Sequence, residues 1–108
     1  MKDDTIFIIQ QGEQLFLQFI VEDKGVTITP ENCTAMRIFL DDIVFEGENI
    51  EYFDNCWNCF ITQTQSLQKS GRYTVQAQWK YTYHDKTIIR KTEKKICKIE
   101  YSEQKEEW

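Results

Sequence analysis

The chain of 108 residues contains little of what helices and catalytic loops usually require. Alanine, the strongest helix former, occurs only at Ala35 and Ala77, and the single proline is Pro30. The four glycines are isolated, so no Gly-x-Ser-x-Gly, phosphate-loop or Gly-x-Gly-x-x-Gly motif occurs. No stretch approaches the ~20 apolar residues that cross a bilayer, and the apolar run at 6–9 is too short for a signal-peptide core. We therefore expect no membrane partner. We also expect the chain to be synthesised and retained in a cytoplasm.

The charge that the chain does carry is unevenly distributed. Residues 1–66 hold three basic and twelve acidic side chains, whereas residues 67–108 hold ten and six. The net charge of −5 disfavours nucleic-acid binding, because an acidic chain repels phosphate. Six basic residues lie close together in the sequence: Lys86, Arg90, Lys91, Lys94, Lys95 and Lys98. They form either a strip that docks the acidic half of a neighbouring copy or, as is more common, an edge strand that lysines protect from pairing with other sheets.

Alternation of apolar and polar residues with a period of two dominates the sequence, and this pattern predicts strands with one buried face. The residues predicted to share such a face are Leu15, Leu17, Phe19 and Val21 in one strand, Thr34, Met36, Ile38 and Leu40 in the next, and Tyr73, Val75, Ala77, Trp79, Tyr81 and Tyr83 in the longest. In the longest strand we expect Val75, Ala77 and Trp79 to be buried. The sequence is thus β-rich along most of its length.

Shorter strand-like runs follow at 43–47, 49–53 and about 57–63. The segment 64–71 is predicted to be a connector with one helical turn and Leu67 pointing inward. The final run, about 87–101, changes its apolar phase between Ile89 and Ile96, which indicates a bulge or kink. The pattern predicts an all-β sandwich or small barrel of about seven to eight antiparallel strands, with one domain at 1–102 and a charged tail at 103–108.

The segment DNCWNCF gives Cys56 and Cys59 the Cys-x-x-Cys spacing of redox pairs and zinc sites. Such pairs usually open a helix or hold a tight turn, but the flanking residues here are strand-like. In an extended strand the two side chains point to opposite faces and lie about 10 Å apart, too far for a disulfide. A four-cysteine zinc site that includes Cys33 and Cys97 remains open if 55–58 is a turn. Reduced, buried thiols are the favoured interpretation for a cytoplasmic chain.

No other pattern indicates catalysis or a cofactor. The only histidine, His84, lies in the apparent hairpin turn YHDK, where an exposed side chain is ordinary. Acidic pairs such as Asp41-Asp42 are typical of turns. We therefore predict a protein that is not an enzyme, with no catalytic, cofactor-binding or metal-binding residues.

The segment KSGRYTVQ resembles the Gly-x-Tyr stretch that opens strand F of immunoglobulin-like domains. Tyr73 matches the tyrosine whose hydroxyl bonds back to the backbone in that family, so we expect its hydroxyl to be hydrogen-bonded. Val75 stands where the family has its second cysteine, so the inter-sheet disulfide is missing. The resemblance implies an immunoglobulin-like β-sandwich, with Trp57 and Trp79 available as core aromatics.

A second resemblance covers most of the chain. The segment QQGEQLFLQFIVEDKGVTITPENCTAMRIFL is similar to the opening of immunoglobulin-like modules of phage baseplate and tail proteins, such as the N-terminal domain of baseplate upper proteins. The segment WNCFITQTQSLQKSGRYTVQAQW resembles their connector and following strand through Leu67, Gly71 and Tyr73. The chain departs from the pattern because the usual Asp-Thr does not follow Gly12, and because it lacks the receptor-facing or trimerising region found beyond such modules.

This resemblance implies a structural component of a phage or prophage virion, at the tail or baseplate. Its partners would be other virion proteins or copies of itself, contacted through sheet faces, edges and loops. The alternative is a stand-alone immunoglobulin-like binding module, used in adhesion or as a host-directed inhibitor.

Overall fold

The computed structural model describes residues 5–104 and 106–108. Strands dominate this part of the chain, as the alternation predicts. The elements are β1 (Thr5–Gln10), β2 (Leu15–Phe19), β3 (Glu22–Asp23), β4 (Val26–Thr27), β5 (Ala35–Leu40), β6 (Ile43–Phe45), the 3-10 turn η1 (Gly47–Asn49), β7 (Ile50–Phe53), β8 (Cys56–Ile61), α1 (Gln63–Leu67), β9 (Gly71–Tyr83), β10 (Lys86–Lys91) and β11 (Lys95–Glu100). Among the described residues, neither helical segment has the length and apolar character needed to span a bilayer.

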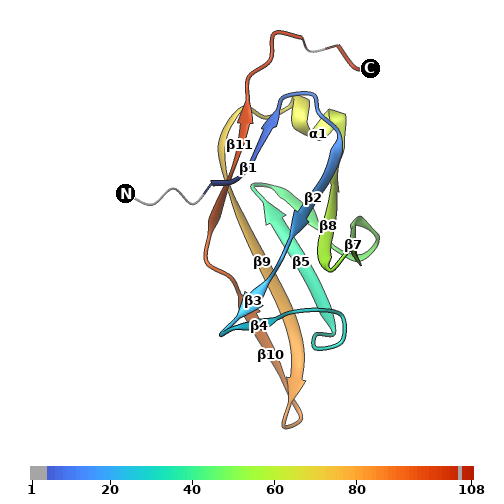
Figure 1. Ribbon diagram of the computed structural model, residues 1–108, viewed down its shortest axis with the longest axis vertical. Coiled ribbons are helices and arrows are strands. Elements are labelled where there is room, and N and C mark those ends of the chain that lie inside the picture. Colours follow the sequence, from blue (N-terminus) through green and yellow to red (C-terminus); the bar gives the residue numbers. More distant parts are fainter. Residues whose placement is uncertain (1–4, 105) are drawn as a thin grey trace.

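The strands form two main sheets and a small ribbon (Figure 1). The larger sheet has the order β1-β11-β9-β5-β6, with β10 also paired to β9. The smaller sheet has the order β2-β8-β7, and β3 pairs with β4. The chain is therefore all-β, but two details differ from the sequence-based prediction. The described residues form eleven strands instead of seven or eight, and β1 pairs with β11 in parallel, because the first apolar run enters the sheet beside the last strand.

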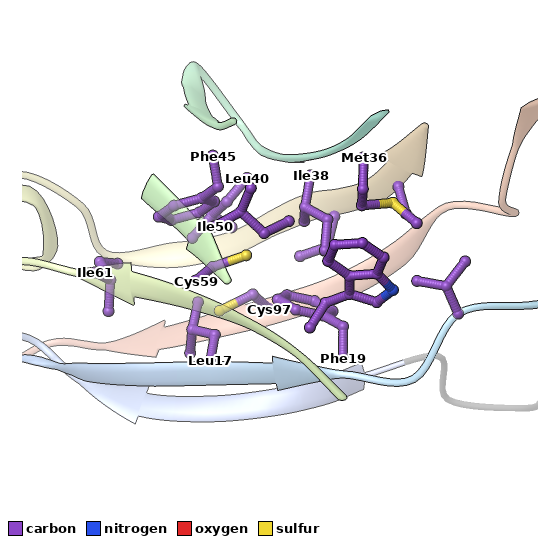
Figure 2. Packing of buried hydrophobic residues seen from close by; sticks show 14 of the residues in the cluster. Leu17, Phe19, Met36, Ile38, Leu40, Phe45, Ile50, Cys59, Ile61 and Cys97 are labelled. Atoms are coloured by element: carbon purple, nitrogen blue, oxygen red, sulfur yellow. The ribbon is translucent and has the colours of Figure 1, made fainter. Parts of the chain in front are cut away.

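The core lies between the two sheets (Figure 2). Leu17, Phe19, Cys59 and Ile61 from the smaller sheet face Met36, Ile38, Leu40 and Cys97 from the larger one. The predicted burial of Val75, Ala77 and Trp79 is confirmed. Tyr83, which was predicted to share their face, is 62% exposed. The reason is that this end of β9 pairs only with β10 and projects beyond the smaller sheet as a hairpin (Figure 1).

The predicted break in the last strand is present. Instead of one kinked strand, β10 and β11 pair with opposite halves of β9. Thr92 lies between them, where its N–H donates to the Ala77 carbonyl at 3.0 Å and its hydroxyl accepts from the Ala77 N–H at 3.0 Å. The Gln76 side chain donates to the Thr92 carbonyl at 2.9 Å. The break is therefore held by hydrogen bonds to β9.

Three hairpins turn on two residues with positive φ: Lys24–Gly25, Asp54–Asn55 and His84–Asp85. Turns of this kind match the twist of the flanking strands and favour Gly, Asn and Asp. The turn at YHDK was predicted from the sequence. The turn at Asp54–Asn55 ends directly before Cys56, so that residue begins β8 and does not belong to the turn.

The end of the sandwich beside α1 is closed by polar contacts. α1 begins with a capping box between Thr62 and Gln65. Ser66, fully buried, donates to the Glu13 carbonyl at 2.7 Å and accepts from the Gly12 N–H at 3.0 Å. The predicted helical turn is thus confirmed, while Leu67 is only half-buried.

The predicted hydrogen bonding of Tyr73 is also confirmed at this end. Its hydroxyl donates to the Ser70 carbonyl at 2.8 Å and accepts from the Ser70 N–H at 2.9 Å. Lys69 lies over the Tyr73 ring, 5.0 Å from its centroid, and bonds Asp41 and Asp42 at 2.8 and 2.6 Å. The connector before β9 is therefore tied to the turn after β5.

Candidate functional site

All four cysteines are free thiols. β8 runs from Cys56 to Ile61, which confirms the strand that places Cys56 and Cys59 on opposite faces. Cys59 and Cys97 are in the core, and burial raises the pKa of their thiols to about 12 and about 11. Cys33 lies in the loop before β5, not in a strand, and is half-buried; burial raises its thiol pKa too. Cys59 and Cys97 are therefore protonated at neutral pH, and protonated thiols are poor nucleophiles and poor metal ligands.

The remaining chemistry-bearing residues of the sequence analysis are also accounted for. His84 is exposed in its hairpin turn, with its ring 4.3 Å from that of Tyr83. Asp41 and Asp42 lie in a turn, as predicted, and bind Lys69. Among the described residues, no three His, Cys, Asp or Glu side chains are grouped so that they would hold a metal ion.

The basic segment is divided between two strands. Lys86, Arg90 and Lys91 belong to β10, which is an edge strand paired only with β9. Lys95 and Lys98 belong to β11, which is covered on both sides by β1 and β9. Edge protection therefore fits β10 and does not explain the lysines of β11.

The outer face of the β2-β8-β7 sheet carries a cluster of three phenylalanines, Phe16, Phe53 and Phe60, which we call the aromatic face. Phe16 lies opposite Phe60 in the register of β2 and β8, and their ring centroids are 5.1 Å apart. Phe16 also meets Phe53 edge-on at 5.5 Å. Because β2 and β7 flank β8, this second contact crosses the outer face of β8. Phe16 and Phe60 remain 48% and 39% exposed, so the cluster is a surface feature.

A buried amide supports the aromatic face from beneath. Asn58 points outward from β8 but is 1% exposed. Its amide nitrogen donates to the carbonyls of Phe53 and Cys56 at 3.0 and 2.9 Å, and its oxygen accepts from the Gln18 side chain at 3.0 Å. These bonds fix the β7–β8 hairpin and link it to β2, which pre-organises the three rings. Sequence reasoning missed Asn58, because its role depends on the register of three strands.

A surface hollow of about 280 Å³ adjoins the aromatic face. Its apolar wall includes Phe16, Phe60 and Val44 of β6, and its rim includes the carboxylates of Glu48 and Glu51. Apolar walls with carboxylates at the rim suit a lysine or arginine, whose stem is apolar and whose head is cationic. The hollow therefore has the chemistry that suits a lysine or arginine side chain.

A second opening of about 690 Å³ lies between the sheets at the end away from α1. Phe19, Val21 and Trp79 line it, and the Arg90 guanidinium bonds both carboxylate oxygens of Asp23 at 3.0 and 3.2 Å across it. Among the described residues, the indole N–H of Trp79 is the buried side-chain polar atom that has no hydrogen-bond partner. This end is thus open and lined by both apolar and charged side chains, and it holds a buried indole N–H that has no hydrogen-bond partner among the described residues.

Comparison of the chain with protein-family models, curated proteins and solved structures finds no match. The case for a function therefore depends on the geometry of the molecule and on the resemblance carried by its sequence.

Proposed function

We propose that the protein is an immunoglobulin-like β-sandwich that acts through protein–protein contacts, without enzymatic chemistry, as a small component of a phage or prophage tail or baseplate. The observation that carries the assembly function is the aromatic face, because three clustered phenylalanines on an exposed sheet are typical of a binding surface. Its partners are other virion proteins or further copies of the chain.

The strand order supports the immunoglobulin-like topology. In that fold one sheet contains strands B, E and D, and the other contains G, F, C and C′. The orders β2-β8-β7 and β11-β9-β5-β6 correspond to these sets in sequence and in space. Tyr73 at the start of β9 bonds the backbone three residues upstream, as the tyrosine of the family's strand F does. Both features support an immunoglobulin-like sandwich in particular, among the possible all-β folds.

The virion assignment is supported by the segments that resemble phage modules. Lys24–Gly25 forms the turn between β3 and β4, within the segment that resembles the opening of those modules. Leu67 ends α1, and Gly71 and Tyr73 begin β9, so the three residues flank the connection at 68–70 in the segment that resembles their connector. A small sandwich with a pre-organised aromatic face suits a subunit that is fixed in a larger assembly.

A stand-alone binding module is the second candidate function. The observation that favours it is the opening beside Trp79, because ligand sites are commonly concave, of about 300–1,000 Å³, and lined by apolar residues with a few polar groups among them. In that case the ligand would enter between the sheets, and substitutions on the aromatic face would not affect binding.

The virion assignment is tested by the composition of particles. A host strain that carries the gene within its prophage is induced, particles are purified on a density gradient, and the chain is quantified by mass spectrometry. We expect a fixed number of copies per particle, located at the tail by labelled antibody. Phe60→Glu should remove the chain from particles, whereas Val26→Glu, a matched change at another exposed apolar residue, should not. A chain found only in the soluble fraction would refute the virion assignment.

A further inference from the structure

The two outer faces of the sandwich differ in charge. Residues that pair directly across a sheet point to the same side, so the register identifies the outward positions. On the larger sheet these positions hold five basic side chains and one acidic side chain, Glu100. The basic residues, which we call the basic face, are Arg37, Arg72, Lys80, Lys91 and Lys98.

The smaller sheet shows the opposite charge. Among its described outward positions there is no lysine or arginine, and Glu51 is the charged residue. Glu48 of η1 adds a second carboxylate at the rim of the hollow. The aromatic face is therefore bordered by negative charge, whereas the opposite side of the same molecule is positive.

The basic face also has an exposed apolar residue at one edge, on strand β1. Ile8 of β1 pairs with Lys98 of β11, which in turn pairs with Arg72 of β9. These three residues form one row across the sheet, and Ile8 is 61% exposed. An exposed isoleucine beside two cations is complementary to exposed phenylalanines beside two carboxylates.

We propose that the aromatic face of one copy docks on the basic face of a second copy, with Lys98 entering the hollow. Its stem packs on Phe16 and Phe60, and its cation lies beside Glu48 and Glu51. This inference rests on the proposed assembly function and names the partner. A contact of standard size buries about 800 Å² per partner, which the broad side of a molecule of 53 × 36 × 24 Å accommodates.

The arrangement determines the kind of assembly. The contact joins two different surfaces, so each added copy presents a free aromatic face at one end and a free basic face at the other. Because these faces lie on opposite sides of the sandwich, repeated contacts add copies head to tail and do not stop at a dimer. The net charge of −5 does not prevent this association. Salt screens exposed charges beyond about 10 Å, so only the charges near the contact affect docking.

The test uses three double variants of the full chain. Glu48→Lys/Glu51→Lys blocks the aromatic face, and Arg72→Ala/Lys98→Ala blocks the basic face. Glu31→Lys/Glu103→Lys changes the net charge as much as the first variant does, at exposed positions outside both faces. All of these are surface changes, and thermal melts check that each variant is folded. Mass is followed by light scattering and native mass spectrometry over a concentration series, in dilute buffer and at about 1 M salt, where screening shortens the Debye length to about 3 Å.

We expect the wild type to form concentration-dependent oligomers in dilute buffer that dissociate at high salt. Each blocking variant alone should weaken association by about tenfold or more, and the control should behave as the wild type. A mixture of the two blocking variants restores one wild-type contact and should give a dimer that does not grow. A wild type that remains monomeric in dilute buffer, or blocking variants that still associate as the wild type does, would overturn the proposal. Either result leaves the particle experiment intact, so failure of this contact is distinguishable from failure of the proposed function.

Discussion

The two ends of the sandwich are closed by different physical means. At the α1 end, directional hydrogen bonds hold the loops together, including those of the buried hydroxyl of Ser66 and of the Tyr73 hydroxyl. At the opposite end, apolar and charged side chains line an opening, the pair of Arg90 and Asp23 crosses it, and the indole N–H of Trp79 has no partner among the described residues. Directional bonds specify one geometry, whereas apolar contacts tolerate adjustment. Hydrogen bonds therefore hold the loops at the α1 end in one geometry, whereas the side chains at the open end can adjust their packing.

The largest effect is expected from Trp79→Ala at the open end. Trp79 is 2% exposed, and its removal leaves a cavity in the core, so we expect the free energy of unfolding to fall by about 3–5 kcal/mol. Tyr83→Ala, at an exposed position on the same face of β9, should change it by less than about 0.5 kcal/mol. Urea unfolding measures both. Equal urea midpoints for Trp79→Ala and the wild type would show that the Trp79 side chain is not buried in the core.

The α1 end is tested by Ser66→Ala. This change leaves the Gly12 N–H and the Glu13 carbonyl without their buried partner, which should cost about 1–3 kcal/mol. Ser70→Ala is the matched control, because Ser70 contributes its backbone, not its side chain, to the bonds with Tyr73. Thermal unfolding of both variants gives the comparison, and a similar loss in each would contradict a specific role for the Ser66 hydroxyl.

The two buried tryptophans allow a finer comparison. The indole N–H of Trp57 donates to the Ile28 carbonyl at 2.9 Å, whereas that of Trp79 has no partner. Substitution by phenylalanine removes similar volume from each site but breaks a hydrogen bond only in Trp57→Phe. We expect Trp57→Phe to be the more costly by about 1 kcal/mol, as measured by denaturant unfolding. The reverse order would mean that the Trp79 N–H is satisfied in solution.

The smallest expected effect is the pH dependence of the ion pair at the α1 end. The bond from Lys69 lowers the pKa of Asp42 below its ordinary 3.8. Stability from this group is therefore present above that value and is lost as the pH falls through the lowered pKa. Burial lowers the pKa of Lys69, but its bonds to Asp41 and Asp42 outweigh this and raise it above 10.5, so that its contribution is lost only as the pH rises beyond the raised pKa.

Lys69→Met should flatten both limbs of the stability curve, which is measured by denaturant unfolding at a series of pH values. Asp85→Asn, a change at an exposed turn residue, serves as the control. An unchanged acid limb in Lys69→Met would show that the pair contributes nothing to folding.

Local pattern predicted the parts of this fold that depend on neighbouring residues. The alternation in β9 located the buried face, the strand character of 56–61 separated Cys56 from Cys59, and Gly71-x-Tyr73 anticipated the hydroxyl bonds. Pairing between distant segments was not predictable from one sequence. β1 was missed because its partner lies about 90 residues away, and the aromatic face was missed because Phe16, Phe53 and Phe60 meet only once the register of three strands is set.

The parallel pairing of β1 and β11 has a mechanical consequence. Thr5 pairs with Ile96 at the start of both strands and Gln10 with Glu100 at their end. A pull applied before β1 and after β11 draws the two strands in opposite directions along their length. All bonds between them then bear the load together in shear, instead of opening one after another as in an unzipped hairpin. Pulling on these two ends should therefore extend the chain little until β1 and β11 separate.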